Sequence, residues 1–209
     1  ALNRDTVAKA YRIAEEGGLR WQLKNLYGPT EASIYSTWYD CTSDCDKVFI
    51  GKPVGNAHAY IMNGDTMCGI GVPGELWIGG KGVAKGYLNN PKLTAMKFTD
   101  SPFTDGLIYH TGDLVRWNSD GNIEYYGRID EQVKIRGFRI ELGEIENHIR
   151  KVADIEDCVL VACDDKVGDK VICAYVVGSG ERLVNKVREE LKKVLPEYCL
   201  LYTSDAADD

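Results

Sequence analysis

The run from Gly127 to Glu146 constrains what this chain can fold into more than any other part of it. Apolar and charged residues alternate there, so Val133 and Ile135 would lie on one face of a strand and Lys134 and Arg136 on the other. A strand that buries one face and presents a row of cations on the other suits an anionic ligand. The same pattern is typical of a solvated edge strand, whose charges discourage pairing with other chains. Taken alone, the run leaves both interpretations open.

Length, composition and charge limit the class of protein. The 209 residues are enough for one large or two small domains, and 44% of them are hydrophobic, so a core can be buried. The net charge of −7 argues against a nucleic-acid-binding protein, whose phosphate contacts need a basic surface. No apolar run approaches the roughly 20 residues of a membrane span, and no signal peptide opens the chain. A cytoplasmic protein of bacterial type, with no membrane partner, is therefore expected.

The seven cysteines predict neither a metal site nor a disulfide. No pair has the Cys-x-x-Cys spacing of a zinc site, and reduced thiols are the simplest state for an odd number of cysteines in a cytosol. Cys158, Cys163 and Cys173 lie in apolar runs that resemble strands, so we interpret all three as small buried hydrophobic residues.

The first part of the chain predicts a helix, a sharp loop and a β-rich region. The helix is expected at 5–16, capped by Asn3 or Asp5. A strand at 21–26 should lead into the loop at 27–31, Tyr-Gly-Pro-Thr-Glu, which glycine and proline force into a turn. Further along we expect a strand at 74–78, a short helix at 91–98, and a hairpin of 115–117 with 123–125 around the Asp-Gly turn at 118–121.

A change of residue pattern near Asp130 predicts that a second unit begins there. Its expected elements are a strand pair at 132–135 and 138–141, helices at 144–152 and 182–195, and strands at 159–163 and 171–177. The buried helix faces should be formed by Ile145, Ile149 and Val152 in the first helix and by Leu183, Val187, Leu191 and Val194 in the second.

Four sequence blocks follow one another in a characteristic order: 25–31 (NLYGPTE), 74–88 (GELWIGGKGVAKGYL), 109–114 (YHTGDL) and 127–146. Together they closely resemble the adenylate-forming, AMP-binding enzymes, and among these the adenylation domains of nonribosomal peptide synthetases. The resemblance implies an α+β fold. Residues 1–129 would be the C-terminal, β-rich part of the large AMP-binding domain, and residues 130–198 a small α/β C-terminal domain joined to it at a hinge.

The resemblance implies that the first block binds ATP. Tyr27, followed by Gly28, would offer an aromatic face to adenine, although a core tyrosine at the end of a strand would fit the same pattern. Thr30 would offer its hydroxyl to the α-phosphate, which is otherwise a typical turn-capping residue. Glu31 would give Mg²⁺ a hard oxygen ligand, whereas a lone glutamate is by default a surface carboxylate.

The later blocks would complete the nucleotide site. By the same resemblance, Asp113 would accept both ribose hydroxyls, and Arg128 would contact the ribose or a phosphate. Without the family context, Asp113 is more simply interpreted as a turn-capping residue. His110 stands where the family often has lysine or arginine, and we interpret it as a partly exposed structural residue.

By the same resemblance, the fourth block, 127–146, would serve thioester formation, the step that follows adenylate formation. Asp130 resembles the residue about which the small domain of this family rotates once the adenylate has formed. Lys134 would act on the face used for thioester formation, and Gly137 would let a phosphopantetheine arm pass close to the backbone. Arg136 and Arg139 belong to the same block, and ordinary surface salt bridges would account for both.

Substrate identity is only weakly indicated. Leu26, Ile34 and Tyr35 match positions of the family's amino-acid pocket, and their apolar character favours an uncharged side chain. The family's phosphate loop and adenylation lysine find no match within this sequence, so we expect the chain alone to be inactive. Residues 199–209 resemble a translated library adapter, so native sequence is expected to end near Tyr198.

The function that the resemblance implies is activation of an amino acid by ATP, followed by transfer to a carrier-protein phosphopantetheine. Its partners would be a peptidyl carrier domain and a neighbouring condensation domain. Two alternatives remain open: a stand-alone acyl-CoA or D-alanine–carrier-protein ligase, and a non-catalytic nucleotide-binding relative. The amino-acid sequences of the blocks at 74–88 and 127–146 favour the peptide-synthetase type over the ligase.

Overall fold

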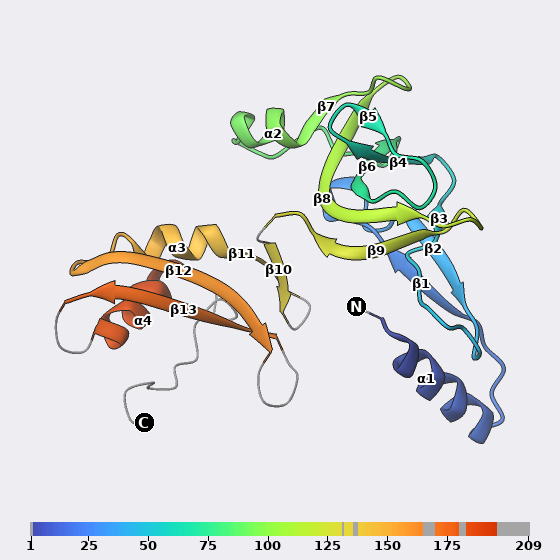
Figure 1. Ribbon diagram of the computed structural model, residues 1–209, viewed down its shortest axis with the longest axis horizontal. Helices are drawn as coiled ribbons and strands as arrows, with labels where there is room; N and C mark the ends of the chain where they lie inside the picture. The colour runs from blue at the N-terminus through green and yellow to red at the C-terminus, as the bar shows by residue number, and fades with distance from the viewer. Residues whose placement is uncertain (1, 131, 136–137, 165–169, 180–182, 196–209) are drawn as a thin grey trace. The chain divides into compact units, whose positions relative to one another are not determined.

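The computed structural model describes residues 2–130, 132–135, 138–164, 170–179 and 183–195 (Figure 1). The chain divides into two compact units, Ala1–Ile129 and Asp130–Asp209. Helices and antiparallel strand pairs occur in both, which confirms the predicted α+β class. In the part of the chain that the structure describes, no helix combines the length and apolar character needed to cross a membrane.

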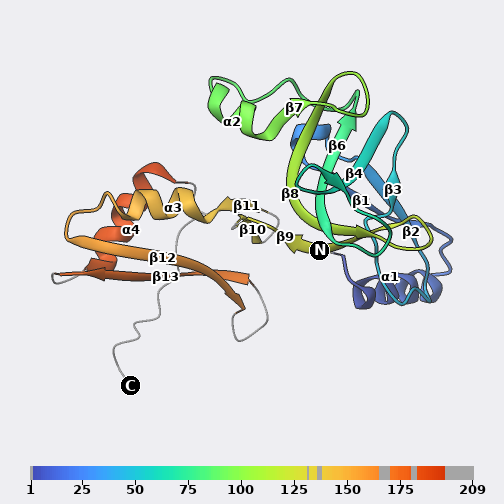
Figure 2. The ribbon, with the colours of Figure 1, turned by 45° about the horizontal axis from the view of Figure 1, so that its top comes forward.

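A six-stranded antiparallel sheet forms most of the first unit. The first residues of β8 pair with β7 and its last residues with β9, so β8 is the long, bent strand in Figures 1 and 2. The strand order is β5-β4-β6-β8-β7, with β9 also on β8. The strands are β4 (Ala57–Asn63), β5 (Thr66–Met67), β6 (Gly74–Gly80), β7 (Phe98–Asp100), β8 (Leu107–Trp117) and β9 (Ile123–Arg128), and the short helix α2 (Pro91–Lys97) precedes β7.

A smaller sheet of three antiparallel strands carries the loop that the sequence singles out. It comprises β1 (Leu23–Tyr27), β2 (Thr37–Cys41) and β3 (Lys52–Pro53), and the one-turn 3₁₀ helix η1 (Thr30–Ala32) lies between β1 and β2. Helix α1 (Arg4–Glu16) begins at the predicted cap, because the Thr6 amide donates to Asn3 Oδ1 over 2.8 Å. Its buried residue Val7 packs with Cys41 of β2.

The core of the first unit joins both sheets. Ala32 of η1 and Ile50 pack against residues of the large sheet, so the loop after β1 is anchored by apolar contacts. Each fully buried isoleucine, leucine or valine side chain in this core stabilises the fold by about 1.5–3 kcal/mol. The buried members of this cluster are Ala32, Ile50, Ile61, Leu76, Ile78, Val115 and Ile123.

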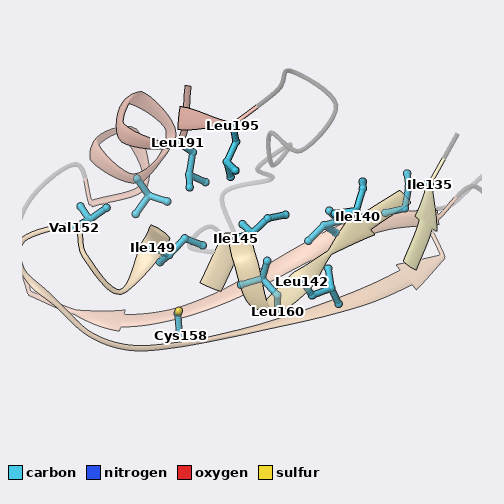
Figure 3. Packing of buried hydrophobic residues seen from close by; sticks show 12 residues of the cluster. Ile135, Ile140, Leu142, Ile145, Ile149, Val152, Cys158, Leu160, Leu191 and Leu195 are labelled. Atoms are coloured by element: carbon cyan, nitrogen blue, oxygen red, sulfur yellow. The ribbon is translucent and has the colours of Figure 1, made fainter. Parts of the chain in front are cut away.

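The second unit places two helices against one face of a strand pair (Figure 3). The hairpin of β10 (Gln132–Ile135) and β11 (Phe138–Glu141) leads into α3 (Leu142–Ile149), and α4 (Leu183–Val194) follows the long pair β12 (Ile155–Asp164) and β13 (Lys170–Gly178). The core contains Ile135, Ile140, Leu142, Ile145, Ile149, Val152, Cys158, Leu160, Ile172, Val187, Leu191 and Leu195.

The helix faces differ from the prediction at two positions of α4, because Leu183 is only partly buried and Val194 is exposed. Val194 is 54% exposed, whereas Leu195 is 8% exposed and takes the place predicted for Val194. The spacing explains this, because Val187, Leu191 and Leu195 follow one another every four residues and form a single stripe. All three residues predicted to be buried at 145–152 are buried. Helix α3, however, starts at Leu142, two residues earlier than predicted, and ends at Ile149.

Two cysteines correct the prediction of reduced, buried thiols. Cys163 and Cys173 form a disulfide between β12 and β13, with their Cα atoms 6.7 Å apart. Successive residues of a strand face opposite sides, so Cys163 and the buried Cys158 cannot share a face. Cys158 points into the core as predicted, whereas Cys163 and Cys173 lie on the opposite face, where the strand register brings them together.

Candidate nucleotide-binding site

The loop after β1 is folded back on itself, as the sequence predicts. The Ser36 amide donates to the carbonyl of Tyr27 over 2.7 Å and closes the loop. Gly28 is required there, since a Cβ atom would lie 2.5 Å from the Cα of Tyr35. Ser33 and Ile34 adopt left-handed backbone conformations with φ of 60° and 73°. Strained backbone in such a loop is typical of a functional segment.

A bulge in β8 presents the Thr-Gly-Asp segment of the third block. The register between β6 and β8 shifts between Glu75 and Trp77, so the residues Thr111 to Asp113 are accommodated opposite a single residue of β6. Gly112 has φ of 71°, a conformation that favours glycine. The Thr111 hydroxyl donates to the Leu76 carbonyl over 2.6 Å and fixes the bulge to β6.

The bulge brings together three residues that the sequence assigns to the nucleotide site. Asp113 is only 3% exposed, and the Tyr27 hydroxyl donates to its Oδ2. Arg128, its cross-strand partner on β9, donates from Nη1 to Asp113 Oδ1 over 3.1 Å and to the Thr111 carbonyl over 2.6 Å. Burial, and then the negative charge of Asp113, raise the pKa of Tyr27 well above its usual value, so its hydroxyl remains a donor at neutral pH.

Glu31 and Thr30 differ sharply in exposure. Thr30 is exposed, whereas Glu31 is 8% exposed, which departs from the surface position that a lone glutamate usually takes. Glu31 Oε1 accepts a hydrogen bond of 2.6 Å from the hydroxyl of Tyr87. The pKa of Tyr87 is raised by burial first and then by this bond to Glu31, so Tyr87 also stays protonated. Sequence reasoning missed Tyr87, because 56 residues separate it from Glu31 and no local pattern connects them.

A pocket of about 260 Å³ lies beside the loop. Tyr35 is one of its lining residues, together with Ser36, Val54 and Val83. Leu26 and Ile34, which the sequence assigns to the same amino-acid pocket, do not line it and are 53% and 78% exposed. Of these three residues, Tyr35 is therefore the one that the structure places in the lining of this pocket.

His110 has the structural environment that the sequence predicts. It is partly buried, its Nε2 lies 2.8 Å from the Thr99 hydroxyl, and its ring lies 4.1 Å from that of Trp77. Burial lowers the pKa of His110, so the imidazole is neutral at neutral pH. It therefore does not supply the positive charge that lysine or arginine would bring to this position.

An ion-pair cluster on β8 and β9 lies in the same unit. Glu124 has a side chain that is 4% exposed, and it pairs with Lys47 and with Arg116, whose Nη2 lies 3.0 Å from Glu124 Oε2. Burial alone would raise the pKa of Glu124, but hydrogen bonds from Lys47, Tyr126 and Arg116 lower it. A carboxylate with two cationic partners contributes to stability only while it is ionised.

The second unit carries the remaining predicted residues. Asp130 is exposed, and its Oδ1 accepts a hydrogen bond of 3.3 Å from the Gln132 amide. Lys134 lies in β10 opposite Arg139 of β11, but its side chain is outside what the structure describes. Gly137 and Arg136 lie outside the described residues, as does the tail at 199–209.

Comparisons with known proteins show which family the chain resembles. The family described as AMP-binding enzyme matches residues 1–88. Over 85% of the chain, a linear gramicidin synthase from Brevibacillus parabrevis is 49% identical, and bacitracin synthase 3 from Bacillus licheniformis is 50% identical. The chain spans only 4% and 3% of the lengths of these two relatives.

Two solved structures extend the match across nearly the whole chain. The Vibrio cholerae adenylation domain AlmE is 28% identical with a TM-score of 0.81, and 96% of this chain covers 39% of it. The fused adenylation–PCP di-domain NpsA-ThdA from Klebsiella oxytoca is 31% identical with a TM-score of 0.69, and 91% of this chain covers 37% of it. The chain therefore belongs to the AMP-binding, adenylate-forming ligases, and the relatives and structures that it matches include nonribosomal peptide synthetases and their adenylation domains.

Proposed function

We propose that this chain forms part of the site at which a nonribosomal peptide synthetase converts an amino acid and ATP into an aminoacyl-adenylate and pyrophosphate. The observation that carries the proposal is that Tyr27 and Arg128 both bond to the buried Asp113. Tyr27 is also the last residue of β1, directly before the turned loop that bears Thr30 and Glu31. The gramicidin and bacitracin synthases support it, as does AlmE, whose structure contains glycyl-adenosine-5′-phosphate.

Tyr27, Asp113 and Arg128 would hold the nucleoside. In this proposal the Tyr27 ring contacts adenine and Asp113 accepts hydrogen bonds from the ribose hydroxyls. Each Asp113 oxygen already accepts a bond from Tyr27 or Arg128. A carboxylate offers about four lone-pair sites, so each oxygen can accept one more donor from ribose. Arg128 balances the charge of the carboxylate and fixes its orientation, which points its remaining acceptor sites toward the ligand.

Thr30 and Glu31 would face the phosphates. The exposed hydroxyl of Thr30 is available to an α-phosphate oxygen. Among the described residues, no group of three or more His, Cys, Asp or Glu is placed to hold a metal. The single carboxylate of Glu31 fits Mg²⁺, which proteins commonly bind through one or two carboxylates together with substrate phosphates. When bound through Glu31, Mg²⁺ would neutralise phosphate charge.

The chemistry is a displacement at the α-phosphorus. One oxygen of the amino acid's carboxylate forms a bond to this phosphorus, the bond to the pyrophosphate oxygen breaks, and pyrophosphate leaves. This step needs no covalent bond between protein and reactants. The protein's contribution is to hold the two reactants in line and to balance charge. The buried, hydrogen-bonded cluster around Asp113 suits this task because its groups are already oriented before ligand binds.

The adenylate would then react with the phosphopantetheine thiol of a peptidyl carrier domain. The sulfur would bond to the acyl carbon, the bond from that carbon to the phosphate oxygen would break so that AMP leaves, and the thiol proton would be released to solvent. By the family resemblance, Asp130 would be the pivot, and Lys134 and Gly137 would serve this step. The adenylation–PCP fusion among the matched structures supports a carrier domain as partner. A neighbouring condensation domain is proposed from the resemblance to multidomain synthetases.

ATP–pyrophosphate exchange tests the proposal. Because the chain covers only 39% of AlmE, the assay uses an adenylation domain that is about as long as AlmE and that contains the residues of this chain. We expect exchange that depends on one amino acid, or a few, from a panel of amino acids, and label transfer to a carrier domain when one is added. Exchange with fatty acids alone, or no exchange with any amino acid tested, would refute the proposed function.

A further inference from the structure

We propose that Tyr87 is a positioning residue for the Glu31 carboxylate, so that the hydroxyl of Tyr87 sets how well Glu31 binds the metal of the ATP complex. This inference rests on the proposed function, in which Glu31 is the metal ligand. It adds a residue that belongs to a different sequence block and that acts through Glu31.

The contact between the two side chains is short and shielded from water. Tyr87 donates to Glu31 Oε1 over 2.6 Å, and the Glu31 side chain is almost fully buried. A buried carboxylate is costly unless hydrogen bonds stabilise its charge. Tyr87 supplies such a bond and also restricts the rotation of the carboxylate about its last torsion. A hydrogen-bonded ligand that cannot rotate freely presents its remaining lone pairs in one direction.

Tyr87 is itself held in place by α2. The Tyr87 amide donates to the Thr94 hydroxyl over 2.9 Å, and its ring lies edge-on to that of Phe98 at 5.4 Å. The backbone can approach α2 this closely only because residue 86 is glycine. A Cβ atom on Gly86 would lie 2.4 Å from Thr94 Cγ2, and its φ of 140° is unfavourable for other residues. Tyr87 is therefore fixed through its amide by Thr94 of α2 and through its ring by Phe98 of β7.

The main chain supports the same arrangement. The Ala84 amide donates to the carbonyl of Glu31 over 2.8 Å, and the Ser33 hydroxyl donates to the carbonyl of Gly82 over 2.7 Å. The segment 81–88 thus holds η1 through its backbone independently of the Tyr87 hydroxyl. Removing that hydroxyl should therefore leave the backbone of the loop folded, so an effect on the carboxylate can be measured in a folded protein.

The test compares Tyr87→Phe with Tyr60→Phe in an adenylation domain that contains this chain. Tyr60 lies in β4 and its ring stacks on Phe103, so it provides the same chemical change away from Glu31. Mn²⁺, a paramagnetic substitute for Mg²⁺, is titrated by electron paramagnetic resonance in the presence of ATP. AMP affinity is measured without metal, and melting temperature serves as the folding control.

We expect Tyr87→Phe to weaken Mn²⁺ binding about 10–100-fold, the range typical of losing a partner that orients a metal ligand. Metal-free AMP affinity should be unchanged, and Tyr60→Phe should resemble the wild type in all three measurements. In a Glu31→Gln background, Tyr87→Phe should have little further effect on Mn²⁺, because Tyr87 acts through the carboxylate.

The outcomes separate this inference from the proposed function. An active wild-type domain in which Tyr87→Phe binds Mn²⁺ normally would overturn the inference alone. Equal additional weakening in the Glu31→Gln background would also overturn it, since Tyr87 would then act by another route. A wild-type domain that neither binds Mn²⁺·ATP nor exchanges pyrophosphate would refute the proposed function and this inference together.

Discussion

Replacing Asp113 by asparagine tests the centre of the candidate site. Asp113→Asn keeps the volume and one carbonyl acceptor of the side chain but removes its negative charge. Two groups then lose a charged partner: the Tyr27 hydroxyl and the Arg128 guanidinium, whose side chain is only 12% exposed. In the proposed function the ribose hydroxyls lose the same partner. The variant should therefore show two separable effects, one on stability and one on nucleotide binding.

The two effects have different expected sizes. Breaking a buried ion pair outright costs about 3–5 kcal/mol, and asparagine retains part of the hydrogen bonding, so a loss of about 2–3 kcal/mol is expected. A domain is typically stable by about 5–15 kcal/mol, so the variant should still fold. Weakened acceptance of two ribose hydroxyls should lower AMP affinity by about 10–100-fold, or about 1.4–2.7 kcal/mol.

Calorimetric titration with AMP and with the amino acid, beside a thermal melt, measures both effects. The matched control is Asp100→Asn, the same change at an exposed position of β7 in the same sheet. Amino-acid affinity should change much less than AMP affinity, and the control should leave both unchanged. If folded Asp113→Asn binds AMP as tightly as the wild type, Asp113 does not contact the ribose and the assignment is wrong.

Further predictions concern single features of the fold. Gly28→Ala should destabilise the first unit by about 1–3 kcal/mol, seen in chemical denaturation, because its Cβ would meet backbone that cannot move aside. The folded-state pKa of Glu124 lies below the ordinary 4.5, so its stabilising effect is complete above pH 4.5 and is lost as the pH falls through the lower value. Glu124→Gln should therefore destabilise the protein at pH 7, with a difference from the wild type that shrinks as the medium is acidified. A reducing agent should lower the melting temperature of the second unit in the wild type but not in Cys173→Ser, which lacks the bond to Cys163; a bridge that closes so short a loop contributes about 2–3 kcal/mol. Asp130→Pro, with its φ fixed, should keep either pyrophosphate exchange or carrier loading and lose most of the other, with circular dichroism as the folding control.

Local patterns predicted the elements of this fold well. The helix at 5–16, the hairpin around the Asp-Gly turn and the strand pair after Asp130 all follow from residue spacing, and the structure contains them. The strand at 115–117, however, is only the end of β8, which begins at Leu107. Thr111 and Gly112 interrupt the alternation that marks a strand, because this part of β8 is bulged. A bulge removes the periodicity from which a strand is predicted.

Contacts between distant residues could not be predicted from spacing. The separation between Tyr27 and Asp113 is 86 residues, and no local pattern records that their side chains meet. The same holds for the burial of Glu31 and its bond to Tyr87. The disulfide was missed for a related reason, since Cys163 and Cys173 become neighbours only once β12 and β13 are in register. Family resemblance indicated which residues matter for binding, but not which of them contact one another.

The contacts within the candidate site bear on the proposed hinge. Tyr27, Asp113, Arg128 and the bulge that orients them lie in the first unit, and their hydrogen bonds described above are made to residues of that same unit. A rotation about Asp130, the first residue of the second unit, would therefore leave these bonds in place. The same holds for Glu31 and Tyr87. In the proposed cycle the nucleotide would stay bound to the first unit, while different residues of the second unit would serve the two half-reactions. A variant arrested at Asp130 should consequently bind AMP as tightly as the wild type even where it loses one half-reaction.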